Sequence, residues 1–319
     1  MINKLLSFLK LIRIQNLIIL FLIQFLLHYF LFENQGNLEF YLLASITFLI
    51  TAAGYIINDI FDVESDKINK EEVIIGNQIP SRQAIFWYYL FNSVAIVLSF
   101  YLVYCINNYY LLIIFFSSIF VLRWYSKTYK HKFIIGNLIV STLTSLSIFN
   151  VYLFCDHTSS NESDFQNLML PLTSRVSFHI NVEFYATIIF VFFSFFLTLS
   201  REIMKDLEDK EGDKLMNSEN IALTFSLNKV KWIVSILLII VLIPLLCILV
   251  SLVDEFIYFY SAKLLFLSIY CSHICFLIIY TIYKIKSSDK KVNFTRVSQL
   301  LKFIMILGIF SVPLFFYFL

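Results

Sequence analysis

Long apolar runs alternate with short polar stretches along almost the whole chain. The runs have the length that a helix needs to cross a bilayer, about 20 residues. Each ends in a charged or turn-forming patch, such as the Asn107-Asn108 pair. The pattern predicts an all-α, polytopic membrane protein whose nine transmembrane helices lie near residues 14–32, 39–59, 84–105, 107–123, 133–154, 184–203, 231–252, 261–284 and 298–318.

The composition agrees with lipid as the main solvent. Of the 319 residues, 60% are hydrophobic and only 14% are charged, whereas a soluble domain has about 25% charged residues. The net charge of +2 gives no indication of a nucleic-acid partner. The first apolar run follows a basic start but lacks the small-residue cleavage site of a signal peptide, so we expect it to be retained as the first helix.

Basic residues concentrate in alternate polar stretches. With nine helices, one side holds the N-terminus and the stretches near 60–83, 123–132, 201–231 and 284–302. That side carries 22 of the 24 Lys and Arg residues, and the other side has only Arg175 and Lys263. The positive-inside rule therefore predicts a cytoplasmic N-terminus and an outer C-terminus. We expect the membrane to be a bacterial inner membrane, and the polar stretch near 155–183 to form an irregular outer loop.

Two of the cytoplasmic stretches carry aspartates with the same spacing, at offsets of 0, 3 and 7. The two sets, at the ends of the second and sixth predicted helices, are Asp59, Asp62 and Asp66, and Asp206, Asp209 and Asp213. On a helix these offsets place three carboxylates within about 60° of one another. Such a face is destabilised by mutual repulsion, especially near lipid, so a cation is expected to bind there.

Mg²⁺ suits this arrangement, because it is bound through one or two carboxylates and completed by phosphate oxygens and water. The repeated spacing also predicts one domain of two pseudo-repeated halves, roughly 1–132 and 133–319, around a central cavity. The alternative is that both stretches are ordinary solvated loops. That alternative explains either stretch alone better than it explains the shared spacing.

A third stretch, 123–132, is strongly basic and is followed by Gly136-Asn137. Its cations, together with two on the second acidic stretch, could neutralise diphosphate oxygens. The positive-inside rule alone would also place basic residues here. The candidate diphosphate contacts from these stretches are Tyr125, Lys127, Lys130, Arg201 and Lys205.

Together these motifs resemble those of the UbiA superfamily of intramembrane prenyltransferases. The stretches that carry the resemblance are Asn58-Asp59-x-x-Asp62-x-x-x-Asp66, Arg201-Glu202-x-x-Lys205-Asp206-x-x-Asp209-x-x-x-Asp213, Tyr125-Ser126-x-x-x-Lys130 with Gly136-Asn137, and Arg13-x-x-Asn16. The resemblance covers nearly the whole chain. It implies nine transmembrane helices around a central cavity, with a cytoplasmic cap formed by the loops after helices two and six.

The resemblance also implies residue roles. All six aspartates would hold Mg²⁺ on a polyprenyl diphosphate, and Asp62, Asp66, Asp209 and Asp213 are our candidate catalytic residues. Arg13, Asn16 and Asn58 join the candidate diphosphate contacts on the same basis. The sequence departs from the family pattern at Asn69-Lys70-Glu71-Glu72-Val73, which lacks the usual proline and following basic residue, and at Asn220-Ile221-Ala222, which replaces a Thr-x-Pro stretch. These departures leave open the acceptor and the effect of the altered flank 71–79.

The predicted reaction is transfer of a polyprenyl group from an isoprenyl diphosphate to an acceptor, with release of diphosphate. An aromatic content of 18% could line a dry cavity that protects an allylic cation. A glycerol-phosphate lipid is favoured as acceptor over an aromatic quinone precursor, a naphthoate or haem. Two other functions stay open. An ion-coupled transporter would need acids near the bilayer midplane, and a degenerate assembly subunit is supported only by the missing basic residue after Lys70.

Overall fold

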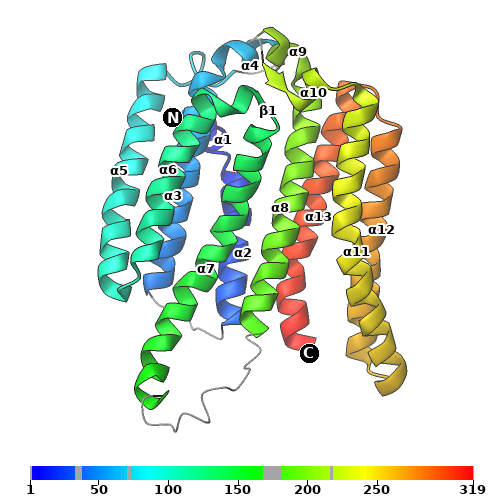
Figure 1. Ribbon diagram of the computed structural model, residues 1–319. Helices are drawn as coiled ribbons and strands as arrows, with labels where there is room; N and C mark the ends of the chain where they lie inside the picture. Colours follow the sequence, from blue (N-terminus) through cyan, green and yellow to red (C-terminus); the bar gives the residue numbers. More distant parts are fainter. Residues whose placement is uncertain (1, 33–37, 70–72, 168–181, 216–217, 319) are drawn as a thin grey trace. The chain divides into compact units, whose positions relative to one another are not determined.

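The computed structural model describes residues 2–32, 38–69, 73–167, 182–215 and 218–318 (Figure 1). Within these residues nine helices are long and apolar enough to cross a membrane, which confirms the predicted number. They are α2 (Ile14–Leu26) continued by the π-helical turn η1 (Leu27–Leu31), α3 (Leu38–Phe61), α5 (Ser81–Ile106), α6 (Tyr109–Lys127), α7 (Ile135–Asn167), α8 (Val182–Glu208), α11 (Leu227–Phe259), α12 (Ala262–Lys286) and α13 (Lys291–Phe318).

Shorter elements connect several of these helices. They are α1 (Ile2–Leu11), α4 (Val63–Asn69), the 3₁₀ turn η2 (Tyr129–His131), β1 (Lys132–Phe133), α9 (Lys210–Leu215), β2 (Glu219–Asn220) and α10 (Ile221–Thr224). The two strands pair in parallel, with Lys132 opposite Glu219 and Phe133 opposite Asn220. This pairing joins the segment after α6 to the segment after α9.

Helix α7 extends further than the sequence pattern predicted. It continues to Asn167, so the expected irregular loop near 155–183 is wrong for its first part, and residues 168–181 lie outside the described residues. Between 155 and 167 there is no proline or glycine. Nothing in the local sequence therefore ends the helix when the apolar run ends.

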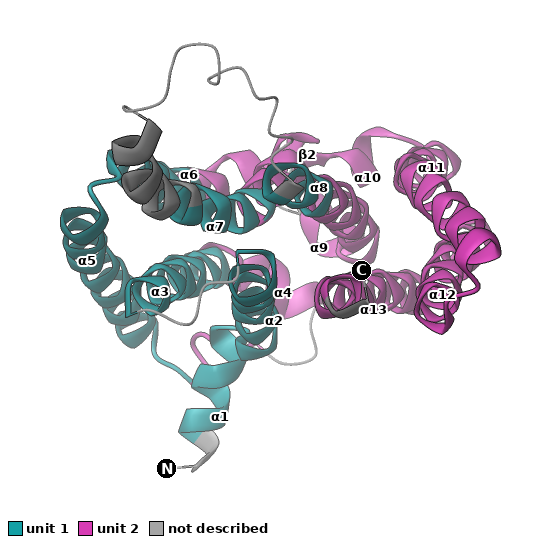
Figure 2. Cartoon of the chain, turned by 90° about the horizontal axis from the view of Figure 1, so that it is seen from below, with its two compact units in different colours: residues 1–60, 79–123, 145–191 teal, residues 61–78, 124–144, 192–319 magenta. Residues whose placement is uncertain are grey.

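The chain forms two compact units (Figure 2). The first comprises residues 1–60, 79–123 and 145–191, and the second comprises 61–78, 124–144 and 192–319. Helices α3, α6, α7 and α8 each continue from one unit into the other. Each unit takes segments from both sides of residue 132, so the two pseudo-repeated halves stay a prediction.

In the first unit, the short turn between α5 and α6 lies where the sequence predicted it. Asn107 ends α5 in the left-handed conformation, with φ of 57°, which asparagine tolerates better than most residues. The Asn108 amide donates a hydrogen bond to the Leu153 carbonyl oxygen at 2.9 Å. Asn108 thereby joins this turn to α7.

In the second unit, α11 packs against α12 and α12 against α13. Their apolar side chains form one buried core with the second half of α8, in which Met204, Leu238, Ile278 and Leu301 are almost fully enclosed. Because Met204 lies two residues before Asp206, this core fixes the end of α8 that carries the second acidic motif.

Candidate functional site

Both acidic motifs have the same local backbone. A long helix ends one residue before the middle aspartate, the chain bends at Asp62 or Asp209, and a short helix, α4 or α9, carries the last one. The Asp66 N–H donates to the Asp62 carbonyl oxygen at 2.8 Å, and the Asp213 N–H donates to the Asp209 carbonyl oxygen at 3.1 Å. Each set therefore lies on two helices joined at a bend and not on one continuous helix as the sequence predicted, and the shared face of the three carboxylates stays a prediction.

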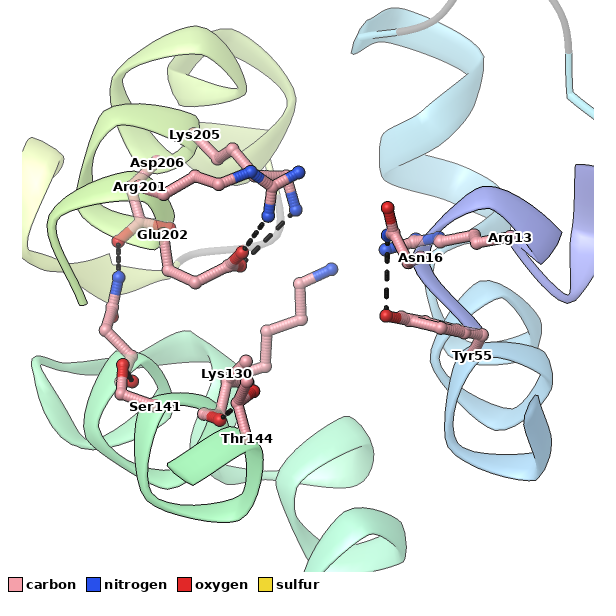
Figure 3. A network of polar contacts seen from close by, with 12 residues as sticks. Arg13, Asn16, Tyr55, Lys130, Ser141, Thr144, Arg201, Glu202, Lys205 and Asp206 are labelled. Carbon is pink, nitrogen blue, oxygen red and sulfur yellow. Dashed lines mark hydrogen bonds and ion pairs between the residues drawn. The ribbon is translucent and has the colours of Figure 1, made fainter. Parts of the chain in front are cut away.

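In the first unit, Arg13 compensates the charge of Asp59. Arg13 joins α1 to α2 in the left-handed conformation, with φ of 52°. Its Nη2 lies 2.9 Å from Oδ1 of the buried Asp59, and its guanidinium lies 4.8 Å from the centre of the Tyr55 ring. Asn16 Nδ2 donates to the Tyr55 hydroxyl oxygen at 3.4 Å (Figure 3). The structure thus brings together Arg13, Asn16 and Asp59. Tyr55, which the sequence analysis did not identify, contacts both Arg13 and Asn16.

In the second unit, Lys130 forms an ion pair with Asp62. The Asp62 side chain is only 3% exposed, and burying a carboxylate costs free energy that a nearby positive charge offsets. Gly136 lets the start of α7 approach the lysine, because a Cβ atom there would lie 3.0 Å from the Tyr129 carbonyl oxygen and 3.1 Å from the Lys130 Cα. This close approach gives the Gly136-Asn137 pair of the sequence motif a steric role.

Asp213 belongs to the same electrostatic cluster. Burial raises its pKa to about 6, Lys130 acts in the opposite direction, and repulsion from Asp209 and Asp62 adds to the rise. Asp62 comes from the first motif, whereas Asp209 and Asp213 come from the second. The two motifs therefore act on each other within the second unit.

Two asparagines hold acids of the second motif in place. Asn137 Nδ2 donates to Asp206 Oδ2 at 2.8 Å, and Asn220 Nδ2 donates to Asp213 Oδ2 at 2.7 Å. Asn220 also begins α10, because its Oδ1 accepts from the Leu223 N–H. An amide can satisfy a buried carboxylate without adding charge. The sequence analysis identified Asn137 and Asn220 as positions in two short stretches, but it did not predict these contacts.

Arg201 and Lys205 lie beside Glu202, a residue absent from the predicted site. Arg201 Nη1 lies 2.7 Å and Lys205 Nζ lies 3.3 Å from the Glu202 carboxylate (Figure 3). All three lie in the last two turns of α8. The two cations are therefore held on the helix that carries Asp206, with their charge shared by one glutamate.

The remaining predicted site residues differ in how far they are buried. Asn58 and Asp66 are buried, Tyr125 is half-buried in the last turn of α6, and Lys127 is exposed at its end. Within the described part of the chain, Lys127 forms no hydrogen bond or ion pair with the aspartates. Its role in binding diphosphate stays a prediction from the sequence.

The acidic clusters fit Mg²⁺ better as part of a diphosphate complex than as a free ion. Among the described residues, no three His, Cys, Asp or Glu side chains are arranged to enclose a metal. However, hard carboxylate oxygens predominate, and Asp213 is repelled by both Asp62 and Asp209, which favours a bound cation. Mg²⁺ commonly takes one or two carboxylates and completes its shell with phosphate oxygens and water. The donor set therefore matches that ion.

Several known proteins resemble this chain in sequence. Residues 21–288 match the model of the UbiA prenyltransferase family. The chain is 35% identical to a digeranylgeranylglyceryl phosphate synthase of Saccharolobus solfataricus, over 74% of this chain and 75% of the relative. It is 28% identical to the synthase of Sulfurisphaera tokodaii, over 79% and 78% of the two chains.

Solved structures share the fold. One, from a study of digeranylgeranylglyceryl phosphate synthase in membranes, has a TM-score of 0.62 at 25% identity and covers 97% of both chains. A UbiA homologue from Archaeoglobus fulgidus, bound to DMAPP and Mg²⁺, has a TM-score of 0.57 at 14% identity, over 96% of this chain and 98% of that one.

Proposed function

Because this chain belongs to the UbiA prenyltransferase family, we propose that it transfers a geranylgeranyl group from its diphosphate to a glycerol-phosphate lipid. The chain is an integral, multi-pass membrane prenyltransferase. The finer assignment is supported by relatives whose name describes a glyceryl phosphate with two geranylgeranyl groups. The observation that best supports the use of a prenyl diphosphate is the cluster of Asp62, Lys130 and Asp213. It combines acids and a cation, as a metal–diphosphate site requires.

In the proposed reaction the allylic C–O bond of the diphosphate breaks and its electron pair stays on the released diphosphate. A hydroxyl oxygen of the acceptor forms the new C–O bond, and the hydroxyl proton passes to the released diphosphate. Asp59, Asp62, Asp66, Asp206, Asp209 and Asp213 would hold Mg²⁺. When bound, this ion supplies positive charge that stabilises the leaving diphosphate. Lys130 and Arg13 place ammonium and guanidinium groups beside Asp62 and Asp59, and such groups can bind phosphate oxygens that the metal does not reach.

A groove in the first unit supports binding of an apolar prenyl tail. It has a volume of about 350 Å³ and is lined by Phe21, Tyr41, Ala44, Ser45, Phe48 and Leu49. On α3, Phe48 and Asp59 are eleven residues apart, so they lie within about 20° of each other around the helix. Leu49 and Asp59 are separated by about 15 Å along the helix axis. A chain whose diphosphate lies near Asp59 could therefore extend along this face.

The orientation is proposed from the charge distribution. The side with 22 of the 24 basic residues carries both acidic motifs, and the positive-inside rule makes it cytoplasmic. The curated relatives named above are archaeal. The expectation of a bacterial inner membrane therefore has no support from them and stays a prediction.

Turnover by the purified protein tests the function. The protein in detergent would be incubated with Mg²⁺, labelled geranylgeranyl diphosphate and one acceptor at a time: geranylgeranylglyceryl phosphate, a hydroxybenzoate or a naphthoate. We expect diphosphate release and a doubly prenylated product with the glycerol-phosphate acceptor. Product from an aromatic acceptor alone would overturn the acceptor assignment. Release with none of the acceptors would favour the transporter or assembly functions.

A further inference from the structure

Asn69, the last residue of α4, contacts two backbone groups of the second acidic motif. Its Nδ2 donates to the Asp209 carbonyl oxygen at 3.0 Å, and its Oδ1 accepts from the Gly212 N–H at 2.9 Å. All of these residues belong to the second unit. A single amide therefore spans the bend between α8 and α9.

A third contact holds the backbone of Asn69 itself. The exposed Lys291, at the start of α13, donates from Nζ to the Asn69 carbonyl oxygen at 2.7 Å. A lysine at the C-terminal end of a helix also interacts favourably with the free carbonyl groups there. The end of α4 is thus held at two places, the backbone carbonyl of Asn69 and the side-chain amide of Asn69.

The contact is specific for an asparagine opposite a glycine. Only an amide of this length offers one donor and one acceptor at the required separation, whereas aspartate keeps only the acceptor and alanine has neither. A Cβ atom on Gly212 would lie 2.4 Å from Asn69 Nδ2. Any other residue at 212 would therefore displace the Asn69 side chain.

These contacts determine how the last aspartates of the two motifs are spaced. Asp66 lies one helical turn before Asn69 on α4, and Asp213 directly follows Gly212 on α9. The two short helices pack against each other. Because Asp66 and Asp213 are both buried, a shift of α4 against α9 would change the separation of their carboxylates.

We propose that Asn69 is a positioning residue of the diphosphate site, and that it sets the spacing of Asp66 and Asp213 by joining α4 to α9. The inference rests on the proposed function, because it assumes that these aspartates bind a metal–diphosphate. Asn69 acts through the two acids and does not itself contact the substrate. Residues that orient ligating carboxylates in this way commonly change metal affinity or activity by about 10–100-fold when they are replaced.

The test compares Asn69→Ala, Asn69→Asp and Gly212→Ala in the full-length protein. Calorimetric titration with inorganic pyrophosphate in the presence of Mg²⁺ measures binding without turnover, and steady-state assays then give KM for the prenyl diphosphate and for the acceptor. We expect the Kd for pyrophosphate and the KM for the prenyl diphosphate to rise by about 10-fold or more in all three variants. The KM for the acceptor should stay the same.

A matched control comes from the same helix. Lys67 is exposed and forms only a surface ion pair with Glu64, so Lys67→Ala should leave every value unchanged. If the three variants lowered only the melting temperature and kept the wild-type Kd, Asn69 would be purely structural and the inference would be overturned. If the wild type bound pyrophosphate in an Asn69-dependent way but used none of the acceptors, the proposed function would fail while this inference stood.

Discussion

The Lys130 ammonium forms an ion pair with the Asp62 carboxylate, although the two residues are 68 positions apart in the chain. Asp62 lies at the bend after α3, and Lys130 lies in the 3₁₀ turn after α6. The pair gives the first acidic motif a cation from its own chain. It thereby links the basic stretch to the acids that are proposed to hold Mg²⁺.

Lys130→Met should destabilise the protein when Mg²⁺ is absent. The substitution keeps most of the side-chain volume and leaves the Asp62 charge buried without its lysine. We expect a loss of about 3 kcal/mol in the free energy of unfolding, the low end for a buried pair, because a quarter of the Lys130 side chain is exposed. Thermal unfolding with and without Mg²⁺ measures this loss, and Mg²⁺ should reduce it. The control is Lys132→Met, which removes an exposed charge two residues away; equal melting temperatures for the two variants would contradict the prediction.

Asp62→Asn and Asp209→Asn should each abolish Mg²⁺-dependent turnover and leave the protein folded in detergent. The amide keeps the size of the side chain but removes the charge that binds the cation, so we expect kcat to fall by at least about 100-fold. Product formation is measured at several Mg²⁺ concentrations, with gel filtration as the test of folding. Wild-type activity in both variants would refute the proposed metal site.

Gly136→Ala should reduce activity by displacing the Lys130 backbone. The new Cβ atom would lie 3.0 Å from the Tyr129 carbonyl oxygen, so that segment must move by a few tenths of an ångström. A shift of this size at a charged group of the site should lower kcat about threefold to tenfold. Gly308→Ala is the control, because a Cβ atom there meets nothing within 4 Å; it should be active and more stable by about 0.5–1 kcal/mol. Identical kinetics for both variants would show that the approach of Gly136 to Lys130 has no role in activity.

His131 should make the stability depend on pH. Burial lowers its pKa below the ordinary value of 6.5, nearby Lys130 lowers it further, and Asp62 acts in the opposite direction. Its Nδ1 lies 2.7 Å from the Ser218 hydroxyl. Because the unfolded chain binds the proton more readily, stability is fully present above about pH 6.5 and falls as the pH drops toward the folded-state pKa. Between about pH 5 and 7.5 the free energy of unfolding should depend less on pH in His131→Gln than in the wild type. An unchanged dependence would show that other groups cause it.

The sequence was sufficient for the membrane-spanning frame but not for the contacts of the site. Span lengths and the Asn107-Asn108 turn follow from local composition, so the number and order of the nine helices could be predicted. Some ends were missed, because α7 continues to Asn167, α11 to Phe259, and α13 begins at Lys291. The bends at Asp62 and Asp209 depend on how α4 and α9 pack, which spacing alone does not reveal. The same holds for the pairing of Asn137 with Asp206, because the two residues are 69 positions apart. Glu202 was visible only as one acid among several, since nothing local indicates that it holds both neighbouring cations.

The parallel pairing of β1 with β2 also has a consequence for the order in which the protein is made. A ribosome releases the N-terminal part of a chain first, and that part begins to fold before the rest exists. Asp62 and Lys130 can meet once α6 has been inserted, whereas β1 must wait until residues 219–220 have been synthesised. During this interval the first acidic motif already has its internal counter-ion. The unfinished chain can therefore remain in the membrane without exposing an uncompensated Asp62 until the second motif arrives.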